Sequence, residues 1–189
     1  MSKLCVFITG TNGVGKSTLA RALQEYYGGI KRTEKNVSYC ENGVAFAGKY
    51  STKYGGVDTI RCKKGSCTWM LAEVVEEALR YANIVFCEGS NLHTFGLNLT
   101  NAMFKADQYL VIPLFTDART IYERLEARNN GRATGRKFDL IIQKQNCVIR
   151  SAKKWASIGV PLLPFDTSKI SPNEMVAQIV KKCTDLVRE

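Results

Sequence analysis

A glycine-rich stretch near the start of the chain constrains the fold more than any other feature. Residues 10–17 read GTNGVGKS, in which two glycines five positions apart are followed by Lys16 and Ser17. The apolar run KLCVFIT precedes the stretch, and apolar residues recur at helical spacing from Ser17 onward. A strand that leads through a glycine loop into a helix presents backbone N–H groups to an anion. The order therefore predicts a loop that wraps phosphate oxygens.

The spacing satisfies the P-loop pattern G-x-x-x-x-G-K-[ST], in which the lysine reaches the outer phosphates of a nucleotide and the hydroxyl binds Mg²⁺. We therefore expect ATP and Mg²⁺ as cofactors, with Lys16 catalytic and Ser17 a metal ligand. The partial positive charge of a helix N-terminus strengthens the same anion site. The residues expected to bind the nucleotide are Gly10, Thr11, Asn12, Gly13, Val14, Gly15, Lys16, Ser17 and Thr18.

The rest of the chain alternates short apolar runs with amphipathic stretches, a pattern typical of a parallel sheet covered by helices. After the first strand, the runs NIVFCEG, DQYLVIPLF and VPLLPFD predict later strands. Helical spacing of apolar residues predicts a helix over 71–82, and a capping box at Ser171 begins the final helix. The predicted fold class is therefore α/β, with a parallel sheet of about five strands flanked by helices.

One segment departs from this alternation. Residues 36–50, NVSYCENGVAFAGKY, read as a β-hairpin that turns at Asn42-Gly43, and we expect this hairpin as an addition to the alternating pattern of strands and helices. Aromatic residues alternate with lysines in and just after this segment, and such a cluster either stacks on a nucleic-acid base or forms the core of the hairpin. The sequence leaves both interpretations open. The aromatic residues and lysines of the cluster are Tyr39, Phe46, Lys49, Tyr50, Lys53 and Tyr54.

Length and composition bound the organisation of the chain. Its 189 residues are 45% hydrophobic without a linker-like stretch, so we expect a single domain over 1–189. No apolar run is long enough to span a bilayer and no signal peptide is evident, so we expect a cytoplasmic protein without membrane contact. The seven cysteines include no C-x-x-C pair and are interpreted as reduced thiols, with Cys5 and Cys87 in the core. The oligomeric state stays open, a dimer included.

Residues that follow the strands are candidates for chemistry, because ligands bind open α/β sheets beyond the carboxyl ends of the strands. Glu88 ends the run NIVFCE, and it would hold Mg²⁺ together with Ser17 or merely cap the next helix. Asp58 follows two glycines that permit close approach of the backbone to a ligand, and we expect it to be the general base for an acceptor hydroxyl. An ion pair with Arg61 is the alternative. His93, the only histidine, suits capping as well as catalysis.

Residues 124–138 combine arginines with a helix break at Asn129-Asn130-Gly131, which predicts an arginine-rich lid. A guanidinium that swings in at closure neutralises charge on the transferred phosphate. We expect Arg128 and Arg132 to be catalytic in this way and Arg136 to contact the substrate. A solvated, charged helix end is the alternative.

The order of these features resembles the nucleoside monophosphate kinases, specifically the thymidylate-kinase-like group, over nearly the whole chain. The chain lacks the N-K-x-D motif with which GTPases select guanine, which argues against a GTPase. The segments AFAGKY, KYGGVDTIR and VFCEGS together are similar to the viral 5-hydroxymethyluracil DNA kinases. This resemblance implies the P-loop kinase fold, a location in the host cytoplasm, and transfer of the γ-phosphate of ATP to the hydroxymethyl group of 5-hydroxymethyluracil in DNA, a step in thymidine hypermodification of a viral genome. The Asp-Arg-Tyr motif of thymidylate kinases is absent, which puts a free thymidylate substrate in doubt.

The charge of the chain independently favours DNA as a partner. It has 27 basic and 17 acidic residues, a formal charge of +10, and residues 128–154 hold eight basic residues against one aspartate. Two alternatives remain: a deoxynucleoside monophosphate kinase that acts on free nucleotides, and an ATP-gated DNA-binding protein without an acceptor. The residues expected to contact the substrate or DNA are Arg61, Lys49, Arg136, Lys144 and Arg150.

Overall fold

The computed structural model describes residues 2–50, 55–60, 67–89, 92, 97–128 and 138–188, with the backbone alone for 67–69 and 97–99. Its strands are β1 (Leu4–Thr9), β2 (Arg32–Glu34), β3 (Val37–Tyr39), β4 (Val44–Ala47), β5 (Ile84–Glu88), β6 (Gln108–Phe115) and β7 (Phe165–Asp166). Its helices are α1 (Lys16–Tyr26), the 3₁₀ turn η1 (Gly56–Thr59), α2 (Cys67–Leu79), α3 (Leu97–Met103), α4 (Ala118–Arg128), α5 (Phe138–Ser157) and α6 (Pro172–Arg188). Within these ranges no helix is both long and apolar enough to cross a membrane.

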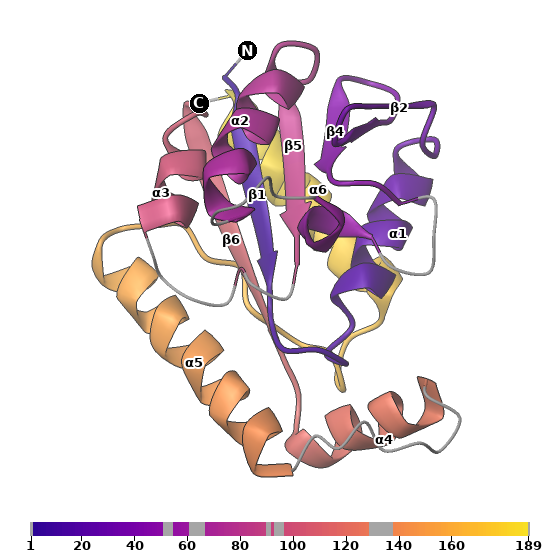
Figure 1. Cartoon of the computed structure of the whole chain (residues 1–189), viewed down its shortest axis with the longest axis vertical. Coiled ribbons are helices and arrows are strands. Elements are labelled where there is room, and N and C mark those ends of the chain that lie inside the picture. The colour runs from indigo at the N-terminus through magenta and orange to yellow at the C-terminus, as the bar shows by residue number, and fades with distance from the viewer. Residues whose placement is uncertain are drawn as a thin grey trace.

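The strands form one sheet in the order β2-β3-β4-β5-β1-β6-β7 (Figure 1). The run from β4 to β7 is parallel, whereas β2, β3 and β4 pair antiparallel. The α/β class predicted from the sequence is confirmed. The sheet has seven strands rather than about five, because the segment before η1 contributes three strands to it.

The predicted hairpin is present and belongs to the main sheet. Asn42 and Gly43 turn the chain with φ angles of 57° and 70°, and β3 and β4 pair in the register Val37↔Ala47. Positive φ at both central positions is what a tight hairpin turn requires, so Asn-Gly is suited to it. All four residues of β4 are buried, and Val44 lies opposite Ile84 of β5. The hairpin predicted within residues 36–50 is therefore confirmed, and its second strand, β4, also joins the parallel core of the sheet.

Helices cover both faces of the sheet (Figure 1). Side chains alternate along β1, so Cys5 and Phe7 pack with α2, α3 and Trp155 of α5, while Val6 and Ile8 pack with α1 and α6. The thiols of Cys5 and Cys87 are buried and reduced, with their sulfurs 4.0 Å apart, which confirms the prediction for these two residues. Burial is the main cause that raises the pKa of Cys5, and the neighbouring Cys87 adds to the shift. The two buried layers fix the sheet and hence the position of every loop at its carboxyl edge.

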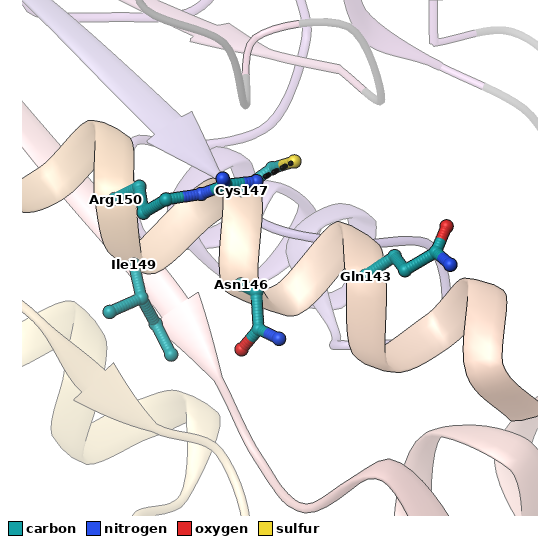
Figure 2. Close-up of a pocket in the computed structure, with 5 residues that line it drawn as sticks. All are labelled: Gln143, Asn146, Cys147, Ile149 and Arg150. Carbon is teal, nitrogen blue, oxygen red and sulfur yellow. Dashed lines mark hydrogen bonds between the residues drawn. The ribbon is translucent and has the colours of Figure 1, made fainter.

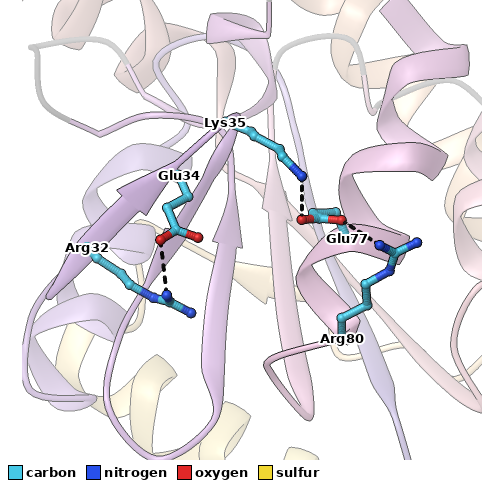
Figure 3. A network of polar contacts seen from close by, with 5 residues as sticks. All are labelled: Arg32, Glu34, Lys35, Glu77 and Arg80. Atoms are coloured by element: carbon cyan, nitrogen blue, oxygen red, sulfur yellow. Dashed lines mark hydrogen bonds and ion pairs between the residues drawn. The ribbon is translucent and has the colours of Figure 1, made fainter.

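Ion pairs tie the antiparallel end of the sheet to α2 (Figure 3). Lys35, in the turn between β2 and β3, lies 2.7 Å from Glu77 of α2, and Arg80 reaches the other oxygen of that carboxylate at 3.2 Å. Arg32 pairs with Glu34 at 3.1 Å along β2. Glu77 is 21% exposed, but its partners and both members of the Arg32–Glu34 pair are about half or more exposed, so each pair contributes at most about 1 kcal/mol.

Candidate active site

The glycine loop lies at the carboxyl end of β1 and runs directly into α1 (Figure 1). A Cβ atom on Gly10 would come within 2.7 Å of Val14 Cγ1 and 2.9 Å of the Leu114 carbonyl, so only glycine lets the loop pass this close to β6. Gly15 has a φ angle of 103° and caps the N-terminus of α1. The loop thus aims the N-terminus of α1 at an anion site, as the sequence predicts.

Lys16 is buried in the loop and is held by the loop itself. Its Nζ donates to the carbonyls of Gly10 at 3.0 Å and Thr11 at 2.8 Å, and the residue is 6% exposed. Burial lowers the pKa of Lys16 to about 8, although Glu88 and Asp58 favour its charged form. The ammonium therefore sits where phosphate oxygens could take over from the two carbonyls as acceptors.

Ser17 and Glu88 meet across the site. The Ser17 hydroxyl donates to Glu88 Oε1 at 3.3 Å, and Glu88 is 3% exposed at the end of β5. Burial raises the pKa of Glu88 to about 7, while Lys16 opposes the shift and Asp58 adds to it. The Glu88 carboxylate is thus engaged with Ser17 in the first turn of α1. A hydroxyl beside a carboxylate provides the oxygen ligands that Mg²⁺ prefers.

Among the described residues, no cluster of three or more His, Cys, Asp or Glu side chains could cage a metal ion. Mg²⁺ usually keeps several waters and takes one or two protein ligands beside the phosphates of a nucleotide. The pair of Ser17 and Glu88 is consistent with that mode of binding.

Asp58 lies on η1 at the rim of the same site. Its carboxylate is exposed, and its Oδ1 would be 3.2 Å from a Cβ atom built on Gly89. Its charge affects the pKa values of both Lys16 and Glu88, which places the three ionisable groups in one electrostatic cluster. The structure therefore brings the expected base close to Lys16 and Glu88 at the nucleotide loop.

The glycines before Asp58 serve a protein contact that differs from the expected one. A Cβ atom on Gly56 would lie 2.2 Å from the Glu88 carbonyl and 2.6 Å from Glu88 Oε1, and Gly56 has a φ angle of 76°. A Cβ atom on Gly48 would lie 1.9 Å from the Gly56 carbonyl. The close approach that the sequence predicts is therefore made to Glu88, and it holds η1 against the end of β5.

The aromatic residues of the hairpin belong to the core. Tyr39 and Phe46 are buried, and the Tyr50 ring packs edge-on against Phe46 with centroids 5.8 Å apart. The Tyr50 hydroxyl is buried with no hydrogen-bond partner in the described part of the chain. Burial is the main cause that raises the pKa of Tyr50, and the negative charge of Glu88 adds to the shift. Of the two interpretations left open for these three rings, the core is the one that the structure favours.

The second half of the chain closes the other side of the loop. Arg128 ends α4 and Lys144 lies on α5, and the charges of both lower the pKa of Lys16. Lys144 also lines a small hollow together with Thr11 and Asn12. The expected site residues Arg128 and Lys144 are thus near the nucleotide loop.

Other expected residues lie away from the loop or outside the described residues. The Lys49 side chain is exposed beside η1, and its backbone N–H donates to Thr59 Oγ1 at 2.8 Å. Arg150 is exposed on the outer side of α5. Most of the predicted lid lies outside the described residues, as do Lys53 and Tyr54. The same holds for four residues singled out in the sequence: Arg61, His93, Arg132 and Arg136.

Three contacts at the site escaped sequence reasoning. Arg124, at the start of the predicted lid, belongs to α4 and donates to the hydroxyl and carbonyl oxygens of Thr167 at 3.0 and 3.1 Å, so it is anchored to the loop after β7. Arg21 favours the charged form of Glu88, and its position one helical turn after Ser17 was an available signal. Thr116, buried just after β6, accepts a hydrogen bond from Gln145 of α5.

Solved structures share this fold over nearly their whole lengths. The YorR protein of Bacillus subtilis, solved in complex with phosphorylated GDP, is 17% identical with a TM-score of 0.59, and 95% of each chain is covered. A deoxyadenosine kinase from M. mycoides, solved with the products dCMP and a flexible dCDP, is 16% identical with a TM-score of 0.57, covering 96% of this chain and 99% of that one.

A sugar kinase from Janibacter sp. HTCC2649 is 14% identical with a TM-score of 0.56, covering 97% of this chain and 95% of that one. No protein-family model matches the chain, and no curated protein matches its sequence. At these identities the likeness concerns the fold, and the chain has the α/β P-loop kinase fold that the sequence predicts.

Proposed function

We propose that the chain is an ATP-dependent kinase that phosphorylates the hydroxymethyl group of 5-hydroxymethyluracil in DNA. The observation that carries the kinase part is the convergence of Lys16, the Ser17–Glu88 pair and Asp58 on the edge of the sheet where the nucleotide loop opens. A phosphate cradle with a carboxylate on its rim can both hold a donor and receive the proton of an acceptor.

On the donor side, the chain supplies positive charge and oriented N–H groups. Lys16 exchanges the carbonyls of Gly10 and Thr11 for phosphate oxygens, and the N-terminus of α1 faces the same phosphates. Ser17 and Glu88 would hold Mg²⁺, which when bound neutralises charge on the phosphate oxygens. Since Glu88 has a pKa of about 7, a bound cation favours its ionised form.

On the acceptor side, Asp58 is the group that accepts the hydroxyl proton as the oxygen attacks the γ-phosphorus. Its carboxylate is exposed and therefore accessible to a substrate, whereas Glu88 is buried and engaged with Ser17. Packing of Gly56 on Glu88 fixes the position of η1, and Asp58 with it. A positioned base of this kind contributes about 10²–10⁴ in rate.

Three features support DNA as the acceptor. The sequence resembles the 5-hydroxymethyluracil DNA kinases in AFAGKY, KYGGVDTIR and VFCEGS. The formal charge of +10 exceeds what two small phosphate clusters need. Lys144 lies beside the nucleotide loop, and Arg150 continues the positive charge along α5. A base inside a strand must leave its stack to reach the γ-phosphate, so we expect base flipping or a preference for single strands at the target.

A second candidate is a kinase that acts on free nucleosides or nucleotides. One structural neighbour, the deoxyadenosine kinase solved with dCMP and dCDP bound, favours this alternative. An ATP-gated DNA-binding protein without an acceptor is favoured less, because such a protein has no use for Asp58 at the rim of the site.

The test offers ATP labelled in its γ-phosphate together with one of four acceptors: DNA that contains 5-hydroxymethyluracil, plain DNA, 5-hydroxymethyl-dUMP, and dTMP. We expect label on the hydroxymethyluracil DNA alone, and none with the Lys16→Ala variant. If a free nucleotide is labelled at every salt concentration, the DNA kinase assignment fails and the second candidate takes its place. Label released only as inorganic phosphate would support the ATP-gated alternative.

A further inference from the structure

The outward side of α5 carries a polar stripe that the proposed chemistry does not use. Gln143, Asn146, Arg150 and Lys153 follow one another at spacings of three, four and three residues, which places them on one side of the helix. All four side chains are exposed. They lie away from the side of α5 that packs on the sheet through Ile141, Val148 and Trp155. We call these four residues the outer stripe.

The outer stripe combines two uncharged amide side chains with two cations, and no carboxylate of the described residues neutralises either cation. Arg150 donates to Cys147 Sγ at 3.2 Å, and neither Arg150 nor Lys153 forms an ion pair with a carboxylate in the described part of the chain. The only acidic residue of α5 is Asp139. Basic residues on other elements do have carboxylate partners, among them Lys31, Arg32, Lys35, Arg80, Lys105, Arg119 and Lys169.

The shape of this surface is that of a helix side with a shallow hollow. Figure 2 shows Asn146 and Ile149 projecting to one side of α5 and Cys147 to the other, with Gln143 farther along the helix and Arg150 bent back toward Cys147. These five residues line the hollow. Ile149 is 44% exposed, so the surface offers an apolar contact among the donors.

The position of the stripe relates it to the nucleotide loop. Lys144 follows Gln143 in the sequence but lies on the side of α5 that carries Ile141 and Val148, and it lines a separate small hollow with Thr11 and Asn12. The Gln143 end of the stripe is therefore one residue away from a contact with the nucleotide loop. From Gln143 to Lys153 the helix rises about 15 Å, at 1.5 Å per residue. At about 3.4 Å per base pair, this length corresponds to roughly four base pairs of a duplex.

We infer that the outer stripe of α5 binds duplex DNA in the major groove on one side of the target base. An exposed helix is narrow enough to enter that groove. Gln and Asn pair with adenine, Arg with guanine, and an apolar side chain contacts the thymine methyl group. The inference deepens the proposed function, because it assigns the kinase a preference for the sequence that flanks its target.

The first test compares two double charge reversals with the same change of net charge. Arg150→Glu with Lys153→Glu alters the stripe, whereas Lys181→Glu with Arg188→Glu alters exposed positions on α6, on the other side of the sheet. The probe is a duplex of 24 base pairs with one central 5-hydroxymethyluracil, and binding is measured by fluorescence anisotropy at several salt concentrations. We expect the stripe variant to raise Kd at least about tenfold and to flatten the salt dependence. The control should raise Kd less than about threefold.

Equal weakening by both variants at unchanged melting temperature would overturn the inference, since it would show attraction by net charge alone. Tighter, equally stripe-dependent binding to RNA of the same sequence would also overturn it. Binding to the unmodified duplex separates this inference from the proposed function. If binding depends on the outer stripe but no DNA is phosphorylated, the inferred DNA-binding role of α5 is supported and the proposed DNA kinase activity fails.

The second test concerns sequence preference. Duplexes randomised at four positions on each side of the target are bound and sequenced. The wild-type chain should select bases on one side only, and Gln143→Ala with Asn146→Ala should abolish the selection of adenine while Kd for the unselected pool changes less than about threefold. Selection that is symmetric, absent in the wild type or unchanged in the variant would refute groove reading by α5.

Discussion

Glu88→Gln should change how the stability of the protein without ligand depends on pH. Burial raises the pKa of Glu88 from 4.5 to about 7, so between these values the folded state holds a proton that the unfolded state releases. The stability that this group contributes is therefore complete below pH 4.5 and is lost as the pH rises through 7. A difference of 2.5 between the two pKa values corresponds to about 3 kcal/mol, at 1.36 kcal/mol per unit. Glutamine does not titrate, so the variant should lack this loss.

The assay is urea unfolding at pH 4.5, 5.5, 6.5 and 7.5 in the presence of EDTA and without nucleotide. The difference in unfolding free energy between Glu88→Gln and the wild type should shift in favour of the variant by about 3 kcal/mol over this range. Glu174→Gln is the control, because Glu174 bonds Ser171 and its pKa is lowered. Its difference from the wild type should run the other way, since stability from a carboxylate of lowered pKa is lost as the pH falls. Parallel curves for Glu88→Gln and the wild type would refute the burial argument.

Three further substitutions test the site. Lys16→Ala should lower turnover by about 10²–10³ because it removes the charge that faces the phosphates, and steady-state kinetics with a melting curve will check this. Asp58→Asn should lower turnover by about 10²–10⁴ while ATP affinity stays within about threefold; equal losses in both would shift the base role elsewhere. Gly56→Ala should destabilise the protein well beyond the roughly 1–2 kcal/mol expected for Gly29→Ala, because both have positive φ and only Gly56 has Glu88 in the way. Similar unfolding free energies for these two variants would contradict the packing of η1 on Glu88.

The nucleotide loop could be predicted from the sequence because its chemistry is local. Gly10, Gly15, Lys16 and Ser17 are close in the chain, and the order of strand, glycine loop and helix by itself places them at the end of β1. The alternation of apolar runs likewise predicted the α/β class, since period and length decide strand or helix within a few residues. The Asn42-Gly43 turn was predicted for the same reason.

What the tertiary structure decided depends on which distant segments meet. The pairing of β4 with β5 places the hairpin inside the sheet, and an isolated strand signal carries no information about its neighbour. Three features of the site depend on contacts between residues more than 30 positions apart. They are the hydrogen bond from Ser17 to Glu88, the packing of Gly56 and η1 against Glu88, and the burial of Tyr50. Burial also sets the pKa values of Lys16 and Glu88, because desolvation is a property of the packed surroundings and not of the residue.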